Sequence, residues 1–569
     1  MKYKGTPIST GIGIGNLIFI DTKPVIVKTQ KISNIESEFV KFDLAVSQSI
    51  QQIENIKENA KDRLSNETLE IFDAHLMIAG DSEIKSKVQS YIKDENISAA
   101  YALNQVANEY IEMFLAMDDA YFKERALDIK DVTQRLIKNL LNIPIVDLES
   151  IDEPTILAID DLTPSMISQL NTDYIKGIIT RMGGKTSHSA IIARLLGLPM
   201  ISNLNVETLK SNTKTIIDGS NGTLIIEPTD EELAFYLKLH EDYLHEQQEM
   251  FKWIGKKSQT KDGHEVLLVA NIGSPSDVAY TEKYDAEGVG LMRTEFLFLD
   301  SNDFPTEEEQ FEAYKTVLQS QGDKPVVIRT IDIGGDKVLP YLKMEHEDNP
   351  FLGVRAIRLA FKELELFKTQ IRALLRASVY GNLKIMFPMI AIKDEFLKAK
   401  SIVLEIKDEL LSQNVKVNDF EIGMMVEIPS SALMADDLAT VVDFFSIGTN
   451  DLIQYTMASD RMNPHLSYLY QPLNPAILRL INMVTSASKK HNLWTGVCGE
   501  MASEVQNALM LIGLGVEELS MSPANILKVR MALAKYNYKD LQALAQKALT
   551  LSTEHDIIML IDSFIKKGE

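Results

Sequence analysis

One histidine of this chain lies in a sequence suited to phosphoryl chemistry. His188 occurs in the segment GGKTSHSAIIARLLGLP (residues 183–199), directly before a short predicted helix. A helix N-terminus presents free N–H groups and a favourable dipole to an anion, and the preceding glycines and hydroxyl residues allow close approach and add donors. A histidine in this setting can attack phosphorus and hold the resulting phosphoryl group. Taken alone, it could also simply cap a surface helix.

A second group of reactive side chains follows apolar runs in the C-terminal half of the chain. Its members are Arg293, Arg329, Arg355, Glu427, Asn450, Asp451, Arg461 and Cys498. The planar fork of arginine donates two hydrogen bonds at once to phosphate or carboxylate, so arginines that converge predict an anion site. Any one of them could instead brace the fold by pairing with a buried carboxylate.

The acidic members and the cysteine suggest further chemistry. Glu427 and Asp451 lie at the ends of neighbouring predicted strands, and two carboxylates with substrate oxygens and water match Mg²⁺, which rarely takes an all-protein cage. A purely structural Glu427 would need a nearby cation. Cys498, in GVCGEM, is either a small inert core residue or, beside an arginine-rich pocket, a proton donor or acceptor.

Eight apolar segments separated by helical patterns must position this second group. They span residues 266–272, 288–293, 325–331, 383–389, 422–428, 443–449, 494–500 and 518–522. Eight strand–helix repeats within residues 257–569 predict a (β/α)₈ barrel. Active residues of such barrels lie at the C-terminal ends of the strands, where these side chains occur.

The N-terminal half predicts two further units and a linker. Residues 1–20, a turn-rich strand pair, and residues 144–228, where short strands and helices alternate, together predict a small α/β domain that carries His188. Residues 21–143 show helical spacing and predict a helical bundle of about four helices inserted into that domain. A charged amphipathic helix at residues 229–256 is the expected linker. The predicted fold class is multidomain α/β.

Composition narrows the classes of protein that fit. The 569 residues carry a net charge of −23, which argues against nucleic-acid binding. No apolar run approaches the ~20 residues of a membrane span, and the first residues lack the apolar core of a signal peptide. The single cysteine excludes an internal disulfide framework and fits a reducing compartment. We therefore expect a cytoplasmic protein without membrane insertion.

The motifs, taken in order, resemble those of one enzyme family over essentially the whole chain. GGKTSHSAIIAR is similar to the phosphohistidine signature of enzyme I of the bacterial sugar phosphotransferase system, the phosphoenolpyruvate–protein phosphotransferase. GVGLMRTEFLFLD, VVIRTIDIGGDK, NPFLGVRAIR, MMVEIPS, SIGTNDLIQYTMASDR and GVCGEMA resemble the barrel motifs of its phosphoenolpyruvate site. AHLMIAGDSE and MDDAYFKERALDIKDV resemble the helical domain that docks the phosphocarrier protein HPr.

The resemblance implies a role for each candidate residue. His188 would be phosphorylated on Nε2, and Cys498 would protonate enolpyruvate to give pyruvate. The magnesium ligands would be Glu427 and Asp451. The phosphoenolpyruvate-binding positions would be Arg293, Arg329, Arg355, Asn450, Asp451 and Arg461.

The resemblance also implies partners and motion. The phosphoryl group would pass from His188 to a histidine of HPr, and the surface that binds HPr would include His75, Asp81 and Glu83. The linker would act as a swivel hinge, and the barrel would form a homodimer.

Three other interpretations fit parts of the chain less well. Phosphoenolpyruvate synthase and pyruvate phosphate dikinase share the swivelling histidine and the barrel, but they need an ATP-binding domain upstream, and the residues before His188 show no glycine-rich nucleotide loop. A nitrogen-branch paralogue usually carries an additional N-terminal sensory domain. A catalytically silent scaffold would have lost one of the reactive residues, and all are present.

Overall fold

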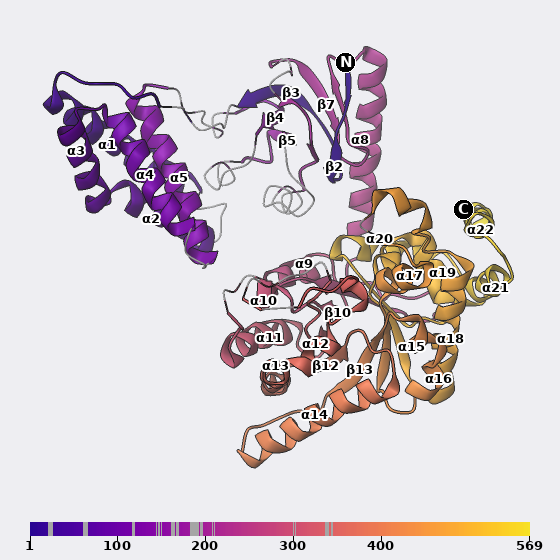
Figure 1. Ribbon diagram of the computed structural model, residues 1–569. Coiled ribbons are helices and arrows are strands. Elements are labelled where there is room, and N and C mark those ends of the chain that lie inside the picture. Colours follow the sequence, from indigo (N-terminus) through magenta and orange to yellow (C-terminus); the bar gives the residue numbers. More distant parts are fainter. Residues whose placement is uncertain are drawn as a thin grey trace. The chain divides into compact units, whose positions relative to one another are not determined.

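The computed structural model describes most of the chain as two compact units, Met1–Gln247 and Gln248–Glu569 (Figure 1). The described residues are 1–568 apart from 21–24, 26, 61–65, 116–119, 144, 146–147, 149–150, 161–165, 167–169, 182–192, 194–196, 207–208, 210, 300, 302, 336–338, 340, 343–344 and 462. Among these described residues, no helix has the length and apolar character needed to cross a membrane.

A mixed eight-stranded sheet lies in the first unit. Its strands are β1 (Lys2–Lys4), β2 (Thr6–Ser9), β3 (Ile12–Ile20), β4 (Thr155–Ile159), β5 (Ile175–Thr180), β6 (Met200–Ser202), β7 (Lys214–Asp218) and β8 (Thr223–Ile226). They are ordered β1-β8-β7-β3-β4-β5-β6-β2, and the run from β3 to β6 is parallel. The N-terminal strands complete the sheet, because β3 pairs with both β4 and β7.

The position of β4 in the middle of this sheet explains why its sequence is almost entirely apolar. Along β4, Ile156 and Ala158 pack into one apolar cluster, and Leu157 and Ile159 pack into another. A strand covered on both faces needs an almost continuous apolar run rather than strict alternation.

Helices α1–α5 follow β3 in the chain and precede β4. They are α1 (Ile35–Ala60), α2 (Asn66–Ala79), α3 (Ser82–Glu95), α4 (Ala99–Leu115) and α5 (Ala120–Leu140). Their apolar faces share one core that includes Phe42, Val88, Leu103 and Ile137. The structure thus describes five helices between β3 and β4, where the sequence predicted about four.

Helix α8 (Asp230–Phe251) connects the two units in sequence. Thr229 and Glu232 form a reciprocal cap at its start: the Glu232 N–H donates to Thr229 Oγ1, and the Thr229 N–H donates to the Glu232 carboxylate. No residue described in this helix is fully buried. The helix corresponds to the charged amphipathic segment at residues 229–256.

Eight parallel strands close into a barrel in the second unit (Figure 1). They are β9 (Leu267–Ile272), β10 (Val289–Met292), β11 (Pro325–Arg329), β12 (Asn382–Phe387), β13 (Glu421–Val426), β14 (Phe444–Ile447), β15 (Trp494–Val497) and β16 (Glu518–Met521). Each strand pairs with the next in sequence, and β16 closes the barrel on β9. Every one of the eight predicted segments overlaps one observed strand, so the predicted (β/α)₈ barrel is confirmed.

Helices follow the barrel strands and share their core. They are α9 (Val278–Lys283), α10 (Phe296–Leu299), α11 (Glu307–Gln321), α12 (Ile357–Lys362), α13 (Leu364–Ala377), α14 (Lys393–Ser412), α15 (Pro429–Leu433), α16 (Ala435–Leu438), α17 (Thr449–Met457), α18 (Pro475–His491), α19 (Val505–Gly513), α20 (Pro523–Leu533), α21 (Tyr538–Ala548) and α22 (Glu554–Gly568). Side chains of β12 alternate between two cores: Ile385 and Phe387 pack with the helices, whereas Met386 joins the barrel interior with Met425 and Phe444.

Arg530 of α20 ties the segment that follows α8 to the barrel. Its side chain is fully buried. The guanidinium donates to Ser258 Oγ at 2.9 Å, to the Trp253 carbonyl at 3.2 Å and to the Asp285 carbonyl at 2.7 Å, and it also pairs with the Asp285 carboxylate. Asp285 lies just before β10, so these contacts are at the N-terminal end of the barrel strands.

We expect Arg530→Met to destabilise the second unit strongly. The substitution leaves Asp285 and two carbonyl acceptors without their cation, and removing one partner of a buried ion pair costs about 3–5 kcal/mol. Urea unfolding followed by circular dichroism measures the loss. Lys528→Met, at an exposed position of the same helix, is the control and should change stability by less than about 0.5 kcal/mol. Equal losses for the two variants would contradict the role assigned to Arg530.

Candidate active site at the mouth of the barrel

The strand ends of the barrel bring the reactive residues of the second group to one mouth. Arg329 is the last residue of β11, and Arg293, Glu427 and Cys498 follow β10, β13 and β15 by one residue. Asn450 and Asp451 lie in the first turn of α17, directly after β14. Because parallel strands of a barrel all end at the same rim, these positions face one another across the mouth.

Arg329 is held by two carboxylates. Its guanidinium bonds to Glu295 Oε1 at 2.8 Å and to Asp332 Oδ2 at 3.0 Å, and its side chain is 7% exposed. Burial alone would lower the pKa of Arg329, but the attraction of Glu295 and Asp332 outweighs burial and raises the pKa above its ordinary value. Arg329 is therefore a permanent, fixed cation.

Arg355 is fixed in the same way and shares a partner with Arg329. One of its terminal nitrogens lies 2.9 Å from Asp332 Oδ1 and 3.6 Å from Asp451 Oδ2. The other donates to the Tyr455 hydroxyl at 3.3 Å. Asp332 thus holds one arginine on each oxygen.

The backbone is strained at two residues next to these charged side chains. Ala356, directly after Arg355, has a φ of 52°, and Met389 has a φ of 57°. Met389 in this left-handed conformation donates its N–H to Glu427 Oε1 at 2.6 Å. Non-glycine residues in this region cost about 1–3 kcal/mol each and are concentrated at functional sites. The strain here orients a candidate metal ligand.

Glu427 and Asp451 are buried carboxylates whose charges are only partly compensated. Their exposed fractions are 1% and 6%. Burial, together with repulsion from Asp451 and Asp332, raises the pKa of Glu427 to about 8, although Arg329 and Arg355 oppose the shift. Oδ1 of Asp451 makes no hydrogen bond although it is buried. Two such oxygens are a natural place for a divalent cation.

Arg293, Arg461 and Asn450 provide the less constrained donors of the mouth. Arg293 is exposed to solvent, although many protein atoms lie around it. This partial burial, followed by repulsion from Arg329, lowers the pKa of Arg293. Arg461 approaches Asp451 Oδ1 only at 3.9 Å, so its fork remains open to other acceptors. Asn450 Oδ1 accepts hydrogen bonds from the Tyr470 hydroxyl and from the Glu500 N–H, both at 3.2 Å. A bound anion stabilises cations that repel one another.

Cys498 lies in the barrel interior, where it is 3% exposed. Burial raises the pKa of Cys498 to about 11, although the charge of Arg329 acts in the opposite direction. Its Sγ lies 3.7 Å from the Ile447 carbonyl, to which the thiol donates. At neutral pH the side chain is therefore the protonated thiol, which can give up a proton.

The sequence did not single out Glu295, Asp332 or Tyr455. The first two follow Arg293 and Arg329 by two and three residues, in the motifs RTEF and RTID. A carboxylate that recurs just after an arginine at a strand end is the signal that could have identified them, because a buried arginine needs a counter-ion.

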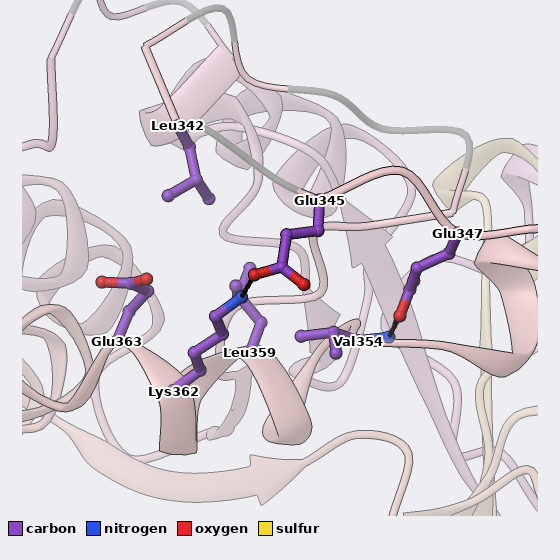
Figure 2. Close-up of a pocket in the computed structure, with 7 residues that line it drawn as sticks. All are labelled: Leu342, Glu345, Glu347, Val354, Leu359, Lys362 and Glu363. Carbon is purple, nitrogen blue, oxygen red and sulfur yellow. Dashed lines mark hydrogen bonds and ion pairs between the residues drawn. The ribbon is translucent and has the colours of Figure 1, made fainter.

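A pocket lined in part by Val354, the residue before Arg355 in the sequence, is too small for a substrate (Figure 2). It encloses about 30 Å³, room for about one water molecule. Its lining residues are Leu342, Glu345, Glu347, Val354, Leu359, Lys362 and Glu363. Both oxygens of Glu347 lie 3.0 Å from the Val354 N–H. A Cβ on Gly353 would lie 1.9 Å from that carboxylate, so a larger residue there would displace the Glu347 side chain that holds the chain just ahead of Arg355.

The residues proposed for the other steps belong to the part of the sequence that precedes the barrel. His188 lies outside the described residues. His75 differs from expectation: its ring is 2% exposed and its Nε2 lies 3.2 Å from Asp128 Oδ1, because the α2 face that carries it packs inside the bundle. Asp81 caps α3 by accepting hydrogen bonds from the N–H groups of Glu83 and Ile84, each at 2.8 Å. Asp81 and Glu83 are exposed.

Three protein families match successive parts of the chain. Residues 4–125 match the N-terminal domain of PEP-utilising enzymes, and residues 151–222 match their mobile domain. Residues 247–538, which form most of the barrel unit, match the PEP-binding domain of PEP-utilising enzymes.

Several relatives that share the name phosphoenolpyruvate-protein phosphotransferase match nearly the whole chain. The phosphoenolpyruvate-protein phosphotransferase of Bacillus subtilis (strain 168) is 46% identical over 99% of this chain and 100% of its own length. Those of Geobacillus stearothermophilus and Staphylococcus carnosus (strain TM300) are 47% and 44% identical, over 99% and 100% of this chain and 97% and 100% of their own lengths. The chain therefore belongs to the family of phosphoenolpyruvate-protein phosphotransferases, the enzyme I family that its motifs resemble.

Proposed function

We propose that this chain transfers the phosphoryl group of phosphoenolpyruvate to its own His188 and then to a histidine of HPr, with release of pyruvate. The observation that carries the proposal is the mouth of the barrel, where arginines, two under-compensated carboxylates and a protonated thiol converge. That set matches the charges and the proton demand of phosphoenolpyruvate turnover.

The arginines bind and orient the substrate. Phosphoenolpyruvate carries a phosphate and a carboxylate, and both suit the bidentate fork of arginine. Arg293 and Arg461 are the more open cations, whereas Arg329 and Arg355 are held by carboxylates. Fixed cations stabilise the charge that develops on the leaving enolate without reorganising during the reaction.

Glu427 and Asp451 fit a resident Mg²⁺. Within the described ranges, no group of three or more His, Cys, Asp or Glu side chains is placed to enclose a metal. Mg²⁺ commonly binds through one or two carboxylates plus substrate oxygens and water, so two carboxylates suffice. Oδ1 of Asp451, which is buried and makes no hydrogen bond, supports this assignment. When bound, the ion would neutralise phosphate charge and polarise the transferring group.

Two side chains carry out the proposed reaction: one accepts the phosphoryl group and the other donates a proton. The neutral Nε2 of His188 forms a bond to phosphorus as the bond between phosphorus and the enol oxygen breaks, and the electron pair stays on the enolate. The Cys498 thiol then gives its proton to the enolate carbon, which yields pyruvate, and solvent reprotonates the thiolate. The raised pKa of Cys498, about 11, keeps this proton in place at neutral pH.

The helical bundle offers a surface for the carrier protein. Asp81 and Glu83 are exposed on the helical bundle, which also exposes the apolar side chains of Val40, Leu44 and Met77 at 69%, 57% and 72%. Exposed apolar and acidic groups suit a partner with a basic, partly apolar face. His75, being buried, would support this surface rather than contact the partner.

The proposal includes a homodimer formed through the barrel and a cytoplasmic location. Along α14, Leu397, Leu404 and Leu411 are 42%, 45% and 47% exposed at seven-residue intervals. This stripe supports a contact with a second copy. The single, buried cysteine supports a reducing compartment.

Incubation with phosphorus-labelled phosphoenolpyruvate and Mg²⁺ tests the relay. We expect acid-labile, base-stable label on the wild type and none on His188→Ala, because a phosphohistidine is the proposed carrier. The label should pass to added HPr. Absence of label from a folded wild-type protein would contradict the proposed function.

Cys498→Ala should separate phosphoryl transfer from protonation. Because a positioned acid contributes about 10²–10⁴-fold, we expect pyruvate formation to slow by at least about 10²-fold. Labelling of His188 in the first turnover should fall much less. Stopped-flow pyruvate detection and quenched labelling measure the two steps, and equal losses in both would refute the assigned proton donor.

Glu427→Gln should alter the pH dependence of stability in metal-free protein. The folded pKa of Glu427, about 8, lies above its ordinary value of 4.5, so unfolding releases a proton between these values. Wild-type stability is therefore lost as pH rises through this window, and the Tm of Glu427→Gln minus that of wild type should increase from about pH 5 to about pH 8.

Excess Mg²⁺ should then raise the Tm of wild type but not of Glu427→Gln. Glu518→Gln is the matched control, because burial also raises the pKa of Glu518 to about 8 and Glu518 lies at the opposite end of the barrel. This control should keep the response to Mg²⁺. A similar response in Glu427→Gln would remove Glu427 from the metal site.

A further inference from the structure

A buried chain of hydrogen bonds runs from helices α11 and α13 to the backbone of Arg329. The Tyr314 hydroxyl donates to Gln310 Oε1 at 3.1 Å, and Gln370 Nε2 donates to that hydroxyl at 3.1 Å. Gln370 Nε2 also donates to Thr294 Oγ1 at 3.2 Å. Thr294 Oγ1 in turn donates to the Arg329 carbonyl at 3.0 Å.

The same glutamine holds the loop that follows Arg329. The Ile331 N–H donates to Gln370 Oε1 at 2.9 Å. A backbone N–H can only donate, so this contact fixes which end of the amide faces the loop and directs both amide N–H groups to Thr294 and Tyr314. Each hydrogen bond of the chain therefore has a defined direction.

The side chains of this hydrogen-bond network are buried, and burying polar groups is costly unless each of them forms its hydrogen bonds. Thr294, Tyr314 and Gln370 are 0% exposed, and Gln310 is 1% exposed. An apolar side chain at any of these positions would avoid the desolvation of a polar group. A satisfied buried network, however, specifies one geometry and rigidifies its surroundings.

The geometry being fixed is that of a phosphoenolpyruvate-binding arginine. Glu295 and Asp332 hold the guanidinium of Arg329, and both flank the network: Glu295 adjoins Thr294, and Asp332 adjoins Ile331 in the sequence. Thr294 holds the carbonyl of the same arginine. Backbone and side chain of Arg329 are thus fixed by two adjoining sets of contacts.

We propose that Thr294 and Gln370 are positioning residues for phosphoenolpyruvate binding, acting through the placement of Arg329 and its loop. The inference rests on the proposed function for the identity of the substrate. Both side chains are fully buried and act on the backbone: Thr294 bonds to the Arg329 carbonyl, and Gln370 bonds to the Ile331 N–H. A small displacement of a positioning group costs binding and rate far from the altered atom.

Two pairs of variants of the full-length protein test the inference. Thr294→Val removes the hydroxyl at constant shape, and Thr294→Ser restores it. Gln370→Met removes the amide. Gln321→Met is its control: Gln321 is the buried last residue of α11, and it donates to Thr281 Oγ1 of α9 at 3.0 Å, so this contact joins residues that precede β10 and β11 rather than residues that follow them. The measurements are the calorimetric Kd for phosphoenolpyruvate, the KM and kcat for pyruvate formation, and Tm.

We expect Thr294→Val and Gln370→Met to raise Kd and KM by about 10-fold, with a smaller change in kcat. Thr294→Ser and Gln321→Met should stay within about twofold of wild type. Unchanged Kd and KM in Thr294→Val, or an equal rise in Gln321→Met at similar loss of Tm, would overturn the inference. If Gln370→Met does not fold, the Thr294 pair decides the question.

The failure of the proposed function would look different. Wild-type protein that binds phosphoenolpyruvate without forming labelled His188 or pyruvate would contradict the proposed reaction, while the Kd values of the variants would still test the positioning role. Wild-type protein that does not bind phosphoenolpyruvate at all would overturn both.

Discussion

The two oxygens of Asp332 hold two arginines at once, and the barrel mouth is arranged around that shared ion pair. Arg329 takes one oxygen at 3.0 Å and Arg355 the other at 2.9 Å. Burying a charge is expensive unless it is paired, and a shared carboxylate pairs two cations while burying a single anion. The shared contact also sets the spacing of the two guanidinium groups.

The charges around this pair leave room for ligands of both signs. Glu295 and Asp332 offset the charges of Arg329 and Arg355, so Glu427 and Asp451 are left as buried carboxyl groups without full compensation. Arg293 and Arg461, the more open arginines, supply a complementary surplus of positive charge. The proposed Mg²⁺ and phosphoenolpyruvate would together satisfy both surpluses.

The two ends of the barrel serve different purposes. At the N-terminal ends of the strands, Lys384 pairs with Glu421, which also accepts a hydrogen bond from Trp494, and Trp494 stacks on Phe444 at 4.4 Å. These groups satisfy one another and close the barrel interior. At the C-terminal ends, the reactive groups converge, Asp451 Oδ1 makes no hydrogen bond, and Met389, which bonds to Glu427, has a φ of 57°. Such barrels place stability at one end and chemistry at the other.

The sequence predicted the barrel because eight apolar runs with helical intervals have few other ways to bury themselves. It also predicted which reactive residues end the strands, since strand ends can be read from the apolar pattern. Glu295 and Asp332 escaped notice because they lie in the loops after those strands, where periodicity carries no information. Likewise, the position of His75 in a helical segment did not reveal whether its ring faces a partner or the core.

The sequence by itself therefore determined the family motifs, the order of the strands and the residue types available at the barrel mouth. The tertiary structure alone decided which carboxylate pairs with which arginine, that Asp332 is shared, and that Gln370 reaches the backbone beside Arg329 from a helix some forty residues further along the chain. The physical reason is that such pairings depend on distances of about 3 Å between side chains far apart in sequence. Only the closed barrel and its packed helices set those distances.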